Sequence, residues 1–492
     1  MGEEITNRQF NAADHARFEQ RLAQETDLLQ QWFETGRFAS SDPVAGFELE
    51  AWLVDPQQLK PAAVNEAFLR RLANPLAFPE LASFNFEVNS TPRTLTGHVF
   101  SSMHNELSRV WQQCRDTASA MDTVLMMTGI LPTLDNDDLS LANMSDMERY
   151  RALNRESIRR RKGKPMVLDI VGCEHLRVTH RDVMLESATT SFQMHMQLNL
   201  SQSVRMFNAS MILSAPLIAL CANSPYLFGK DLWDETRIPL FEQAVALGGF
   251  GDAAFGPIQR VTFGSGYVRR SLFECFKENR EHYPVLLPVE YEEPVEALHH
   301  LRFHNGTIWR WNRPLIGFNP TGFGEAGVDK IGSPHLRLEQ RVVPAGPTVL
   351  DAIANAAFFY GVLYALGTAD IAPESLLEFE HAKDNFYLAA RRGLNATICW
   401  STGMNGTKQV SVHELLKNEL LPLAYQGLQQ LAVSTTDIKE YLGIIEQRLE
   451  TGINGARWQR AYTAKHGMNM QGLAAAYLKR QESGEPVHRW TV

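Results

Sequence analysis

The stretch Gly46-Phe-Glu-Leu-Glu-Ala-Trp52 decides the fold, because it alternates apolar residues with two glutamates. Alternate side chains of a β-strand share one face, so Glu48 and Glu50 are predicted to point the same way. The apolar residues between them then face a core, and the two carboxylates line a wet cavity. The alternative interpretation is an ordinary strand with an acidic edge that faces solvent.

Three further segments show the same alternation: Phe84-Asn-Phe-Glu-Val-Asn-Ser-Thr-Pro92, Phe192-Gln-Met-His-Met-Gln-Leu198 and His335-Leu-Arg-Leu-Glu-Gln-Arg341. They are predicted to be strands whose polar side chains form rows on one face. The first carries Glu87, the second Gln193, His195 and Gln197, and the third Arg337, Glu339 and Arg341. Each also has a structural interpretation: a surface ion pair for Glu87, a hydrogen-bonded buried histidine, and an ion-pair ladder.

If these strands are neighbours, they gather at least four carboxylates, an imidazole and two guanidinium groups in one cavity. Two carboxylates about 4 Å apart repel each other by roughly 4 kcal/mol at an effective dielectric constant near 20. Bound divalent cations neutralise such a cluster most simply. Carboxylate oxygens suit Mg²⁺ or Mn²⁺, and one imidazole ligand is compatible with Mn²⁺ or a loosely held Mg²⁺. The four segments therefore predict a metal-dependent enzyme.

The rest of the chain predicts an α+β protein that is almost wholly helical from about residue 348. The segments 248–251, 263–267 and 319–324 are rich in glycine and are predicted to be active-site loops. We expect one large catalytic domain over 1–492, with a core at about 40–400 and a helical extension at about 405–492. Strands are expected at 46–54, 83–89, 124–130, 192–200, 299–311 and 335–343, and helices at 10–37, 64–73, 97–123, 202–222, 348–367, 375–390, 411–431, 435–449 and 455–481.

Composition excludes several other classes of protein. The 492 residues carry a formal net charge of −9, which argues against a nucleic-acid or anionic-membrane binder. Five scattered cysteines indicate reduced thiols and a cytoplasmic protein. The longest apolar stretch, 209–222, is interrupted by serines and a proline, and is predicted to be too short to span a bilayer. No membrane association is expected; the apolar helical C-terminal third could support a homodimer.

The order of the motifs resembles the carboxylate–amine ligases of the glutamate–cysteine ligase type 2 group, which have a glutamine-synthetase-like fold. The resemblance runs from about Phe47 to about Asn395, and only short segments match closely. They are Gly46-Phe-Glu48-Leu-Glu50, Glu87-Val-Asn-Ser-Thr-Pro92, Gly129-Ile-Leu-Pro132, Arg149-Tyr150, Gln193-Met-His195, Ala222-Asn-Ser-Pro225, Arg237 and Leu338-Glu339-Gln-Arg341. Two positions depart from the family pattern: Thr236 replaces a serine before Arg237, and Arg392-Gly-Leu394 lacks an acidic residue.

The resemblance implies a curved, mainly antiparallel sheet that lines the active site, with helices packed on its outer face. It also implies ATP-dependent joining of a carboxylate, usually the γ-carboxylate of glutamate, to an amine such as cysteine, as in glutathione biosynthesis. ATP and two or three Mg²⁺ or Mn²⁺ ions are the implied cofactors. The implied metal ligands are Glu48, Glu50, Glu87, His195 and Glu339. Arg341 is implied to stabilise the transferring phosphoryl group, Arg337 and Arg237 to contact substrate carboxylate or phosphate, and Arg149, Gln193 and Asn223 to bind nucleotide or orient substrate.

Two alternatives remain open from the sequence. One is a guanidino-kinase-like phosphotransferase, which releases no inorganic phosphate. The other is a catalytically silent relative that binds nucleotide or amino acid. Substrate specificity is expected in the segments 226–267 and 312–334, where aromatic residues either line an amine pocket that favours a bulkier amine than cysteine or pack the core. These residues are Trp233, Phe255, Tyr267, Trp309 and Trp311.

Overall fold

The computed structural model describes residues 4–5, 9–247, 259–319, 332–403 and 406–492. The predicted glycine-rich loop at 248–251, residues 320–324 of the loop at 319–324, and Phe255 lie outside these ranges. The helices are α1 (Ala12–Thr35), α2 (Asn65–Leu72), α3 (Val99–Ser119), α4 (Glu148–Arg160), α5 (Ser203–Cys221), α6 (Arg237–Ala244), α7 (Phe273–His282), α8 (His299–Gly306), α9 (Val349–Gly367), α10 (Phe379–Arg392), α11 (Val412–Leu415), α12 (Leu421–Gln430), α13 (Thr435–Thr451), α14 (Gly455–His466) and α15 (Met470–Glu482).

The strands form one large sheet and several short pairs. The strands are β1 (Val44–Val54), β2 (Ala77–Pro79), β3 (Asn85–Asn89), β4 (Arg93–Thr94), β5 (Val124–Met126), β6 (Met166–Val171), β7 (His175–His180), β8 (Phe192–Leu198), β9 (Tyr226–Leu227), β10 (Lys230–Asp231), β11 (Val261–Thr262), β12 (Trp309–Arg310), β13 (Asn312–Phe318), β14 (Pro334–Gln340), β15 (Thr397–Ser401) and β16 (Thr407–Ser411).

The large sheet places the four motif-bearing strands side by side. Its order is β13-β14-β8-β1-β3-β2, β4 and β5 also pair with β1, and the pairings are antiparallel. Glu50 lies opposite Glu87, and His195 lies opposite both Gly46 and Glu339. The polar residues that the sequence places on separate strands are therefore cross-strand neighbours.

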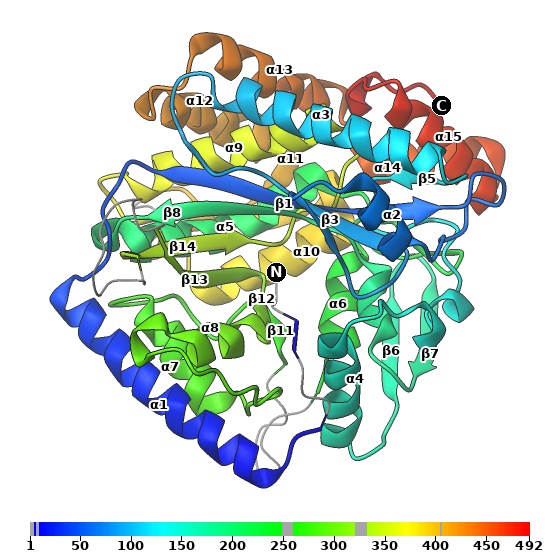
Figure 1. The fold of residues 1–492 in the computed structure, drawn as a ribbon. Helices are drawn as coiled ribbons and strands as arrows, with labels where there is room; N and C mark the ends of the chain where they lie inside the picture. Colours follow the sequence, from blue (N-terminus) through cyan, green and yellow to red (C-terminus); the bar gives the residue numbers. More distant parts are fainter. Residues whose placement is uncertain (1–3, 6–8, 248–258, 320–331, 404–405) are drawn as a thin grey trace.

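The sheet separates two layers of helices (Figure 1). On one side, α9 and α3 lie against the sheet, and α12 and α13 cover them. On the other side, α8 and α4 stand below the sheet. The alternation that places glutamates on this second face turns Phe47 and Leu49 into the core, where both are buried. The predicted α+β fold, with a curved antiparallel sheet and helices on its outer face, is confirmed.

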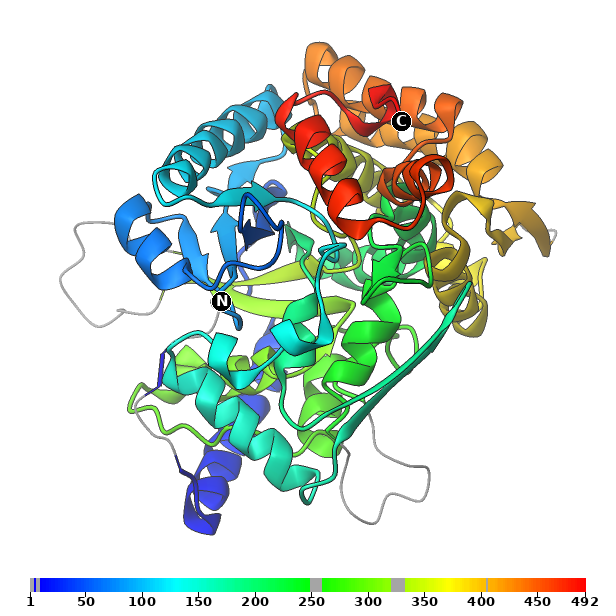
Figure 2. The same cartoon turned by 90° about the vertical axis from the view of Figure 1, so that its right-hand side faces the viewer.

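Three of the predicted elements are wrong. Residues 299–306 form α8 instead of a strand, and the strand next to β14 is β13. The helix predicted over 455–481 is two helices, because α14 ends before Gly467, at φ +83°, and Asn469 caps α15 by accepting from the Gly472 amide. The region after residue 348 also contains the β15–β16 hairpin. A second hairpin, β6–β7, had no predicted counterpart, and its strand β6 packs against α6 along the side of the molecule (Figure 2).

Two helices are long and apolar enough to cross a membrane by length and composition, Leu200–Cys221 and Val349–Gly367. The first contains residues 209–221 of the stretch that the sequence suggested was too short, and extends it toward the N-terminus. In the most apolar stretch of each helix, 89% and 78% of the residues, respectively, are buried inside the protein. Pro216 lies within α5, yet every residue from Met206 to Cys221 is buried. Both helices are therefore core helices of this fold.

Candidate active site

Two groups of acidic and histidine side chains lie on the open face of the sheet. The first comprises Glu48, His195 and Glu339, and the second Glu50, Glu80 and Glu87. In each group the candidate ligand atoms lie within 4.8 Å of one another. Glu48 and Glu50 share a face, as the period-2 rule predicts, but each belongs to a different group. We call these the histidine cluster and the carboxylate cluster.

The histidine cluster spans β1, β8 and β14. His195 Nε2 lies 3.4 Å from Glu48 Oε1 and 3.8 Å from Glu339 Oε1. Neither His195 Nε2 nor Glu48 Oε2, both buried, has a hydrogen-bond partner among the described residues. Burial lowers the pKa of His195 and outweighs the two carboxylates, which raise it. A neutral imidazole with an unpaired ring nitrogen beside carboxylates is the donor arrangement that a metal ion needs.

Glu339 is also held by two arginines. Arg313 on β13 binds it through both carboxylate oxygens, at 2.7 Å and 2.9 Å, and Arg341 Nη1 lies 3.2 Å from Oε2. Although burial opposes ionisation, the arginines hold the pKa of Glu339 well below its usual range. Arg341 Nη1 also donates to Gln193 Oε1. Glu339 is thus a fixed anion between the two arginines and His195.

The carboxylate cluster brings three acids together with less compensation. Burial and the neighbouring acids raise the pKa of Glu87 well above its usual range, and burial also raises the pKa of Glu80. Burial raises the pKa of Glu50 to about 7, although Ser191 and Gln193 donate to its carboxylate. Neither oxygen of Glu87 has a hydrogen-bond partner within the described chain. Such a group favours a bound cation.

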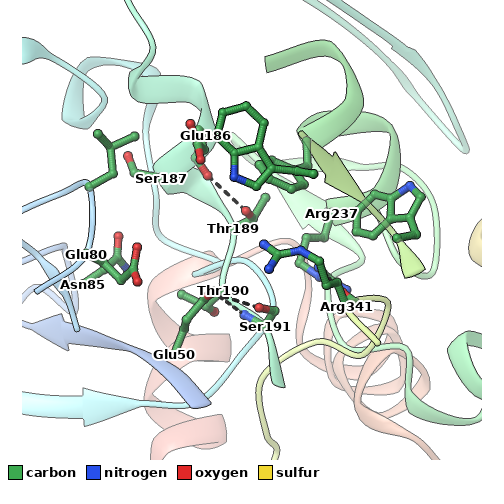
Figure 3. Close-up of a pocket in the computed structure, with 14 residues that line it drawn as sticks. Glu50, Glu80, Asn85, Glu186, Ser187, Thr189, Thr190, Ser191, Arg237 and Arg341 are labelled. Atoms are coloured by element: carbon green, nitrogen blue, oxygen red, sulfur yellow. Dashed lines mark hydrogen bonds between the residues drawn. The ribbon is translucent and has the colours of Figure 1, made fainter. Parts of the chain in front are cut away.

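Three pockets border these clusters. The central pocket, of about 600 Å³, is lined by Glu50, Glu80, Glu186, Arg237 and Arg341 together with Trp309 and Trp311. Figure 3 shows Glu80 on one side of it and both arginines on the other. The outer pocket, of about 1210 Å³, is lined by Glu48, His195, Arg337, His335 and Phe318. The apolar pocket, of about 900 Å³, opens beside the central pocket and is lined by Tyr150, Leu153, Leu287, Phe303 and Trp309.

The three arginines that the resemblance assigns to substrate or phosphoryl contact lie at two of these pockets. Arg341 and Arg237 line the central pocket, and Arg337 lines the outer pocket. Arg237 donates to Glu235 at 3.1 Å and to the backbone carbonyls of Arg341 and Val342, which follow β14. Burial lowers its pKa. The Nε of Arg337 has no hydrogen-bond partner in the described chain, so this cation has capacity for a ligand.

Two of the remaining predicted residues lie away from the clusters. Arg149 lines the apolar pocket, where it donates to the Tyr150 hydroxyl at 2.6 Å. Asn223 lies outside the three pockets and is wholly buried. Its side chain donates to Ala345 O and Tyr477 Oη and accepts from Gln459. The structure does not bring Asn223 to the site, and its predicted role in orienting substrate has no contact in support.

Three charged residues of the site were missed from the sequence: Glu80, Glu186 and Arg313. Glu80 follows Pro79 in a turn between β2 and β3, where no periodicity marks it. Glu186 stands in the short helical turn Met184–Ala188, and the acid within the apolar run Val183-Met-Leu185 was a weak signal. Arg313 lies opposite Glu339 in the β13–β14 register. If the strand had been predicted at 312–318 instead of 299–311, Arg313 and Glu339 would have been recognised as cross-strand neighbours.

Part of the chain matches a known protein family. The family model for glutamate–cysteine ligase family 2 matches residues 44–271, which carry Glu48, Glu50, Glu80, Glu87 and His195. The match covers slightly less than half of the chain. The resemblance indicated by the motifs is confirmed over these residues. The strand with Glu339 lies beyond the match.

One solved structure shows a similar fold over most of the chain. The chain resembles the glutamate–cysteine ligase of Francisella tularensis, solved in complex with AMP, with a TM-score of 0.51 and 11% identity over 91% of this chain and 90% of that one. A bifunctional glutathione synthetase from Pasteurella multocida gives a TM-score of 0.49 and 10% identity over 93% of this chain and 55% of that one. At such identities only the fold is compared. No curated protein matches the chain.

Proposed function

We propose that this protein is an ATP-dependent ligase that joins the γ-carboxylate of glutamate, or a similar carboxylate, to an amine through an acyl phosphate. The observation that carries the proposal is the pair of acidic clusters on one sheet face, each bordered by a pocket and an arginine. Both steps of the reaction concentrate negative charge, which cations and guanidinium groups stabilise.

The two clusters fit divalent metal ions. Glu48, His195 and Glu339 would hold one ion, and Glu50, Glu80 and Glu87 another. The unpaired Nε2 of His195 and the unpaired oxygens of Glu87 support this assignment. Mg²⁺ or Mn²⁺ bound there would neutralise the phosphates of the nucleotide and polarise the transferring phosphoryl group. Glu80 thus joins the five ligands assigned from the sequence.

We place the nucleotide phosphates at the outer pocket and the carboxylate substrate at the central pocket. The outer pocket joins Arg337 to the His195 side of the sheet, and the apolar ring of Phe318 contributes to its wall. The central pocket joins Arg237 and Arg341 to the carboxylate cluster. Arg341 contacts Glu339 and Gln193, so it stands between the two clusters. From there it can stabilise the phosphoryl group as it moves from nucleotide to acid.

The domain organisation, the partners, the cellular location and the oligomeric state also remain proposals or predictions. We propose that residues 1–492 act as one catalytic domain and that the substrates are small molecules. The absence of nucleic-acid and membrane partners, the cytoplasmic location and the homodimer stay predictions. Cysteine as the amine is one option among several.

The test measures ADP and inorganic phosphate with ATP, Mg²⁺ or Mn²⁺, a panel of carboxylic acids including glutamate, and hydroxylamine as a small amine. A ligase gives hydroxamate and phosphate in equal amounts, and only when acid and amine are both present. We expect Glu87→Gln to lower this rate by about 100-fold or more, since it removes an anionic ligand. The matched control is Glu66→Gln, on the exposed surface of α2.

The alternatives give different results in the same assay. ADP without inorganic phosphate indicates a phosphotransferase. Nucleotide binding in a calorimeter, without turnover for any acid, indicates a silent relative. A Glu87→Gln protein with full turnover contradicts the metal assignment while leaving the ligase reaction in place.

A further inference from the structure

The apolar pocket and the central pocket share a wall. Glu80, Leu81, Glu186 and Trp309 line both of them. The apolar pocket extends away from the carboxylate cluster between α4, which supplies Leu153, and α8, which supplies Phe303. A molecule seated there has its inner end beside the place where the carboxylate substrate reacts.

Glu186 marks the junction of the two pockets. It lies across the central pocket from Arg341 in Figure 3. Its Oε2 is buried without a hydrogen-bond partner among the described residues. Burial, with Glu80 and Glu50 nearby, raises the pKa of Glu186 to about 8, and Arg341 opposes this rise. An unpaired carboxyl oxygen in such a place is costly unless a cation or a hydrogen-bond donor meets it.

The chemistry of the two walls selects the ligand. The outer wall offers Tyr150, Leu153, Leu287 and Phe303, which suit an apolar body. The inner wall offers carboxylates, which suit an ammonium group. The arginines that suit the acid substrate, Arg237 and Arg341, lie at the other end of the central pocket. Acid and amine therefore have separate places that meet at the carboxylate cluster.

We propose that the apolar pocket is the acceptor site for a primary amine, free or as an α-amino acid, that carries a bulky apolar side chain, and that Glu186 binds its ammonium group. This inference rests on the proposed ligase function and names the substrate class of that site. The nitrogen attacks the acyl carbon, the C–N bond forms, and the C–O bond to phosphate breaks, with the electron pair leaving on phosphate. The ammonium group gives up two protons in all, one to phosphate and one to solvent.

The first experiment compares amines at saturating ATP and acid. The acid is the one that gives most hydroxamate with hydroxylamine. We expect 2-phenylethylamine, leucine or phenylalanine to show a KM at least about ten-fold below those of ethanolamine and glycine, because their apolar groups leave water. Cysteine is expected between these groups. Equal KM values across the panel, or a preference for the smallest amines, would overturn the inference.

The second experiment changes the pocket. Leu153→Trp fills the apolar pocket and should raise the KM of the bulky amine at least about ten-fold more than it raises the KM of hydroxylamine. Glu186→Gln should raise the KM of the amine more than those of ATP and acid. The matched control is Leu388→Trp on the exposed surface of α10, which should change neither reaction.

Failure of this inference and failure of the ligase proposal are distinguishable. If the unaltered protein forms no hydroxamate with any acid, the ligase proposal fails. If hydroxamate forms normally but Leu153→Trp and Glu186→Gln leave the KM of every amine unchanged, the ligase stands and the acceptor site is wrong. Hydroxamate formation by each variant also shows that the variant is folded.

Discussion

Glu242 lies behind the central pocket and supports one of its walls. Its Oε1 accepts from Trp311 Nε1 at 2.8 Å and from the Tyr387 hydroxyl at 2.9 Å. Trp311 in turn lines the pocket. Burial raises the pKa of Glu242 to about 7, against the effect of these two donors. The folded protein therefore favours the neutral carboxylic acid at this position.

This shift predicts a pH-dependent stability. Between pH 4.5 and 7 the folded state binds a proton at Glu242 that the unfolded chain has lost, so stability falls as pH rises through this window. Glu242→Gln keeps an acceptor oxygen for both donors and cannot ionise. Because the side chain is partly exposed, we expect the variant to be more stable than the unaltered protein by about 1–3 kcal/mol at pH 8, with the difference shrinking toward pH 5.

Chemical denaturation at pH 5, 6, 7 and 8 measures this difference. Glu419→Gln, at an exposed position, is the matched control and should show no such trend. A difference between Glu242→Gln and the unaltered protein that is the same at every pH would contradict the assignment of the titration to Glu242.

At the scale of single residues, the sequence predicts side chains that alternate on strands and misses those in turns. Glu48, Glu87 and Glu339 were found because their strands have apolar neighbours at period 2. Glu80 lies in a turn, and its carboxylate reaches the cluster only through the path of the chain between β2 and β3. No spacing rule gives that path.

At the scale of elements, α8 shows why a periodicity can mislead. Its buried residues, His300, Leu301, His304 and Asn305, follow helical spacing, but three of the four are polar. They are tolerated because they are hydrogen-bonded: His300 to Glu25 at 2.8 Å, and Asn305 to Asn279 at 2.8 Å. A hydrophobic pattern therefore does not reveal this helix, whereas β1 and α9 carry apolar faces and were predicted nearly to their ends.

The contact between α9 and the sheet fixes the strands that carry the site. The Tyr360 hydroxyl on α9 lies 2.8 Å from Gly46 O and 3.0 Å from His195 O. These two residues are opposite each other on β1 and β8. One hydroxyl thus ties the helical layer to both strands at the level of the histidine cluster.

Tyr360→Phe removes this contact and leaves the ring in place. We expect the free energy of unfolding to fall by about 1–2 kcal/mol, because a buried hydrogen bond is lost and the carbonyls lose a donor. Tyr364→Phe on the same helix is the matched control, since its hydroxyl makes no hydrogen bond to a described residue, and we expect a change within about 0.5 kcal/mol. Urea unfolding measures both. Equal losses in the two variants would show that the Tyr360 hydroxyl is not a specific link.

At the scale of the whole molecule, the C-terminal helices are built into the core. Gln481 on α15 accepts from Met127 N at 2.7 Å and donates to Leu125 O at 2.9 Å, next to β5 of the large sheet. Tyr477 donates to Met127 O at 2.7 Å. From α14, Gln459 donates to Asn223 at 3.0 Å. The polar groups around Asn223 thus join the middle of the chain to its end.

These links bear on the predicted single domain, in which the C-terminal extension is an integral part and not an added unit. Gln481→Ala removes one link in the full chain, and we expect it to lower the unfolding free energy by about 1–3 kcal/mol, because two buried backbone groups lose partners. Gln429→Ala, exposed on α12, is the control and should change little. The difference between the two variants measures how much the contact of Gln481 with the strand region stabilises the full chain.

Removal of 453–492 tests the one-domain prediction directly. The shortened chain loses α14 and α15, their buried apolar residues, and the partners of Asn223 and of the backbone beside β5. Each buried group left unpaired costs about 1–3 kcal/mol, and a whole domain is stable by only about 5–15 kcal/mol. We therefore expect residues 1–452 to lose the sharp thermal transition and near-ultraviolet circular dichroism of the full chain. A shortened chain that unfolds cooperatively at the temperature of the full protein would show a separate C-terminal unit, because an integral core cannot lose two of its helices without losing stability.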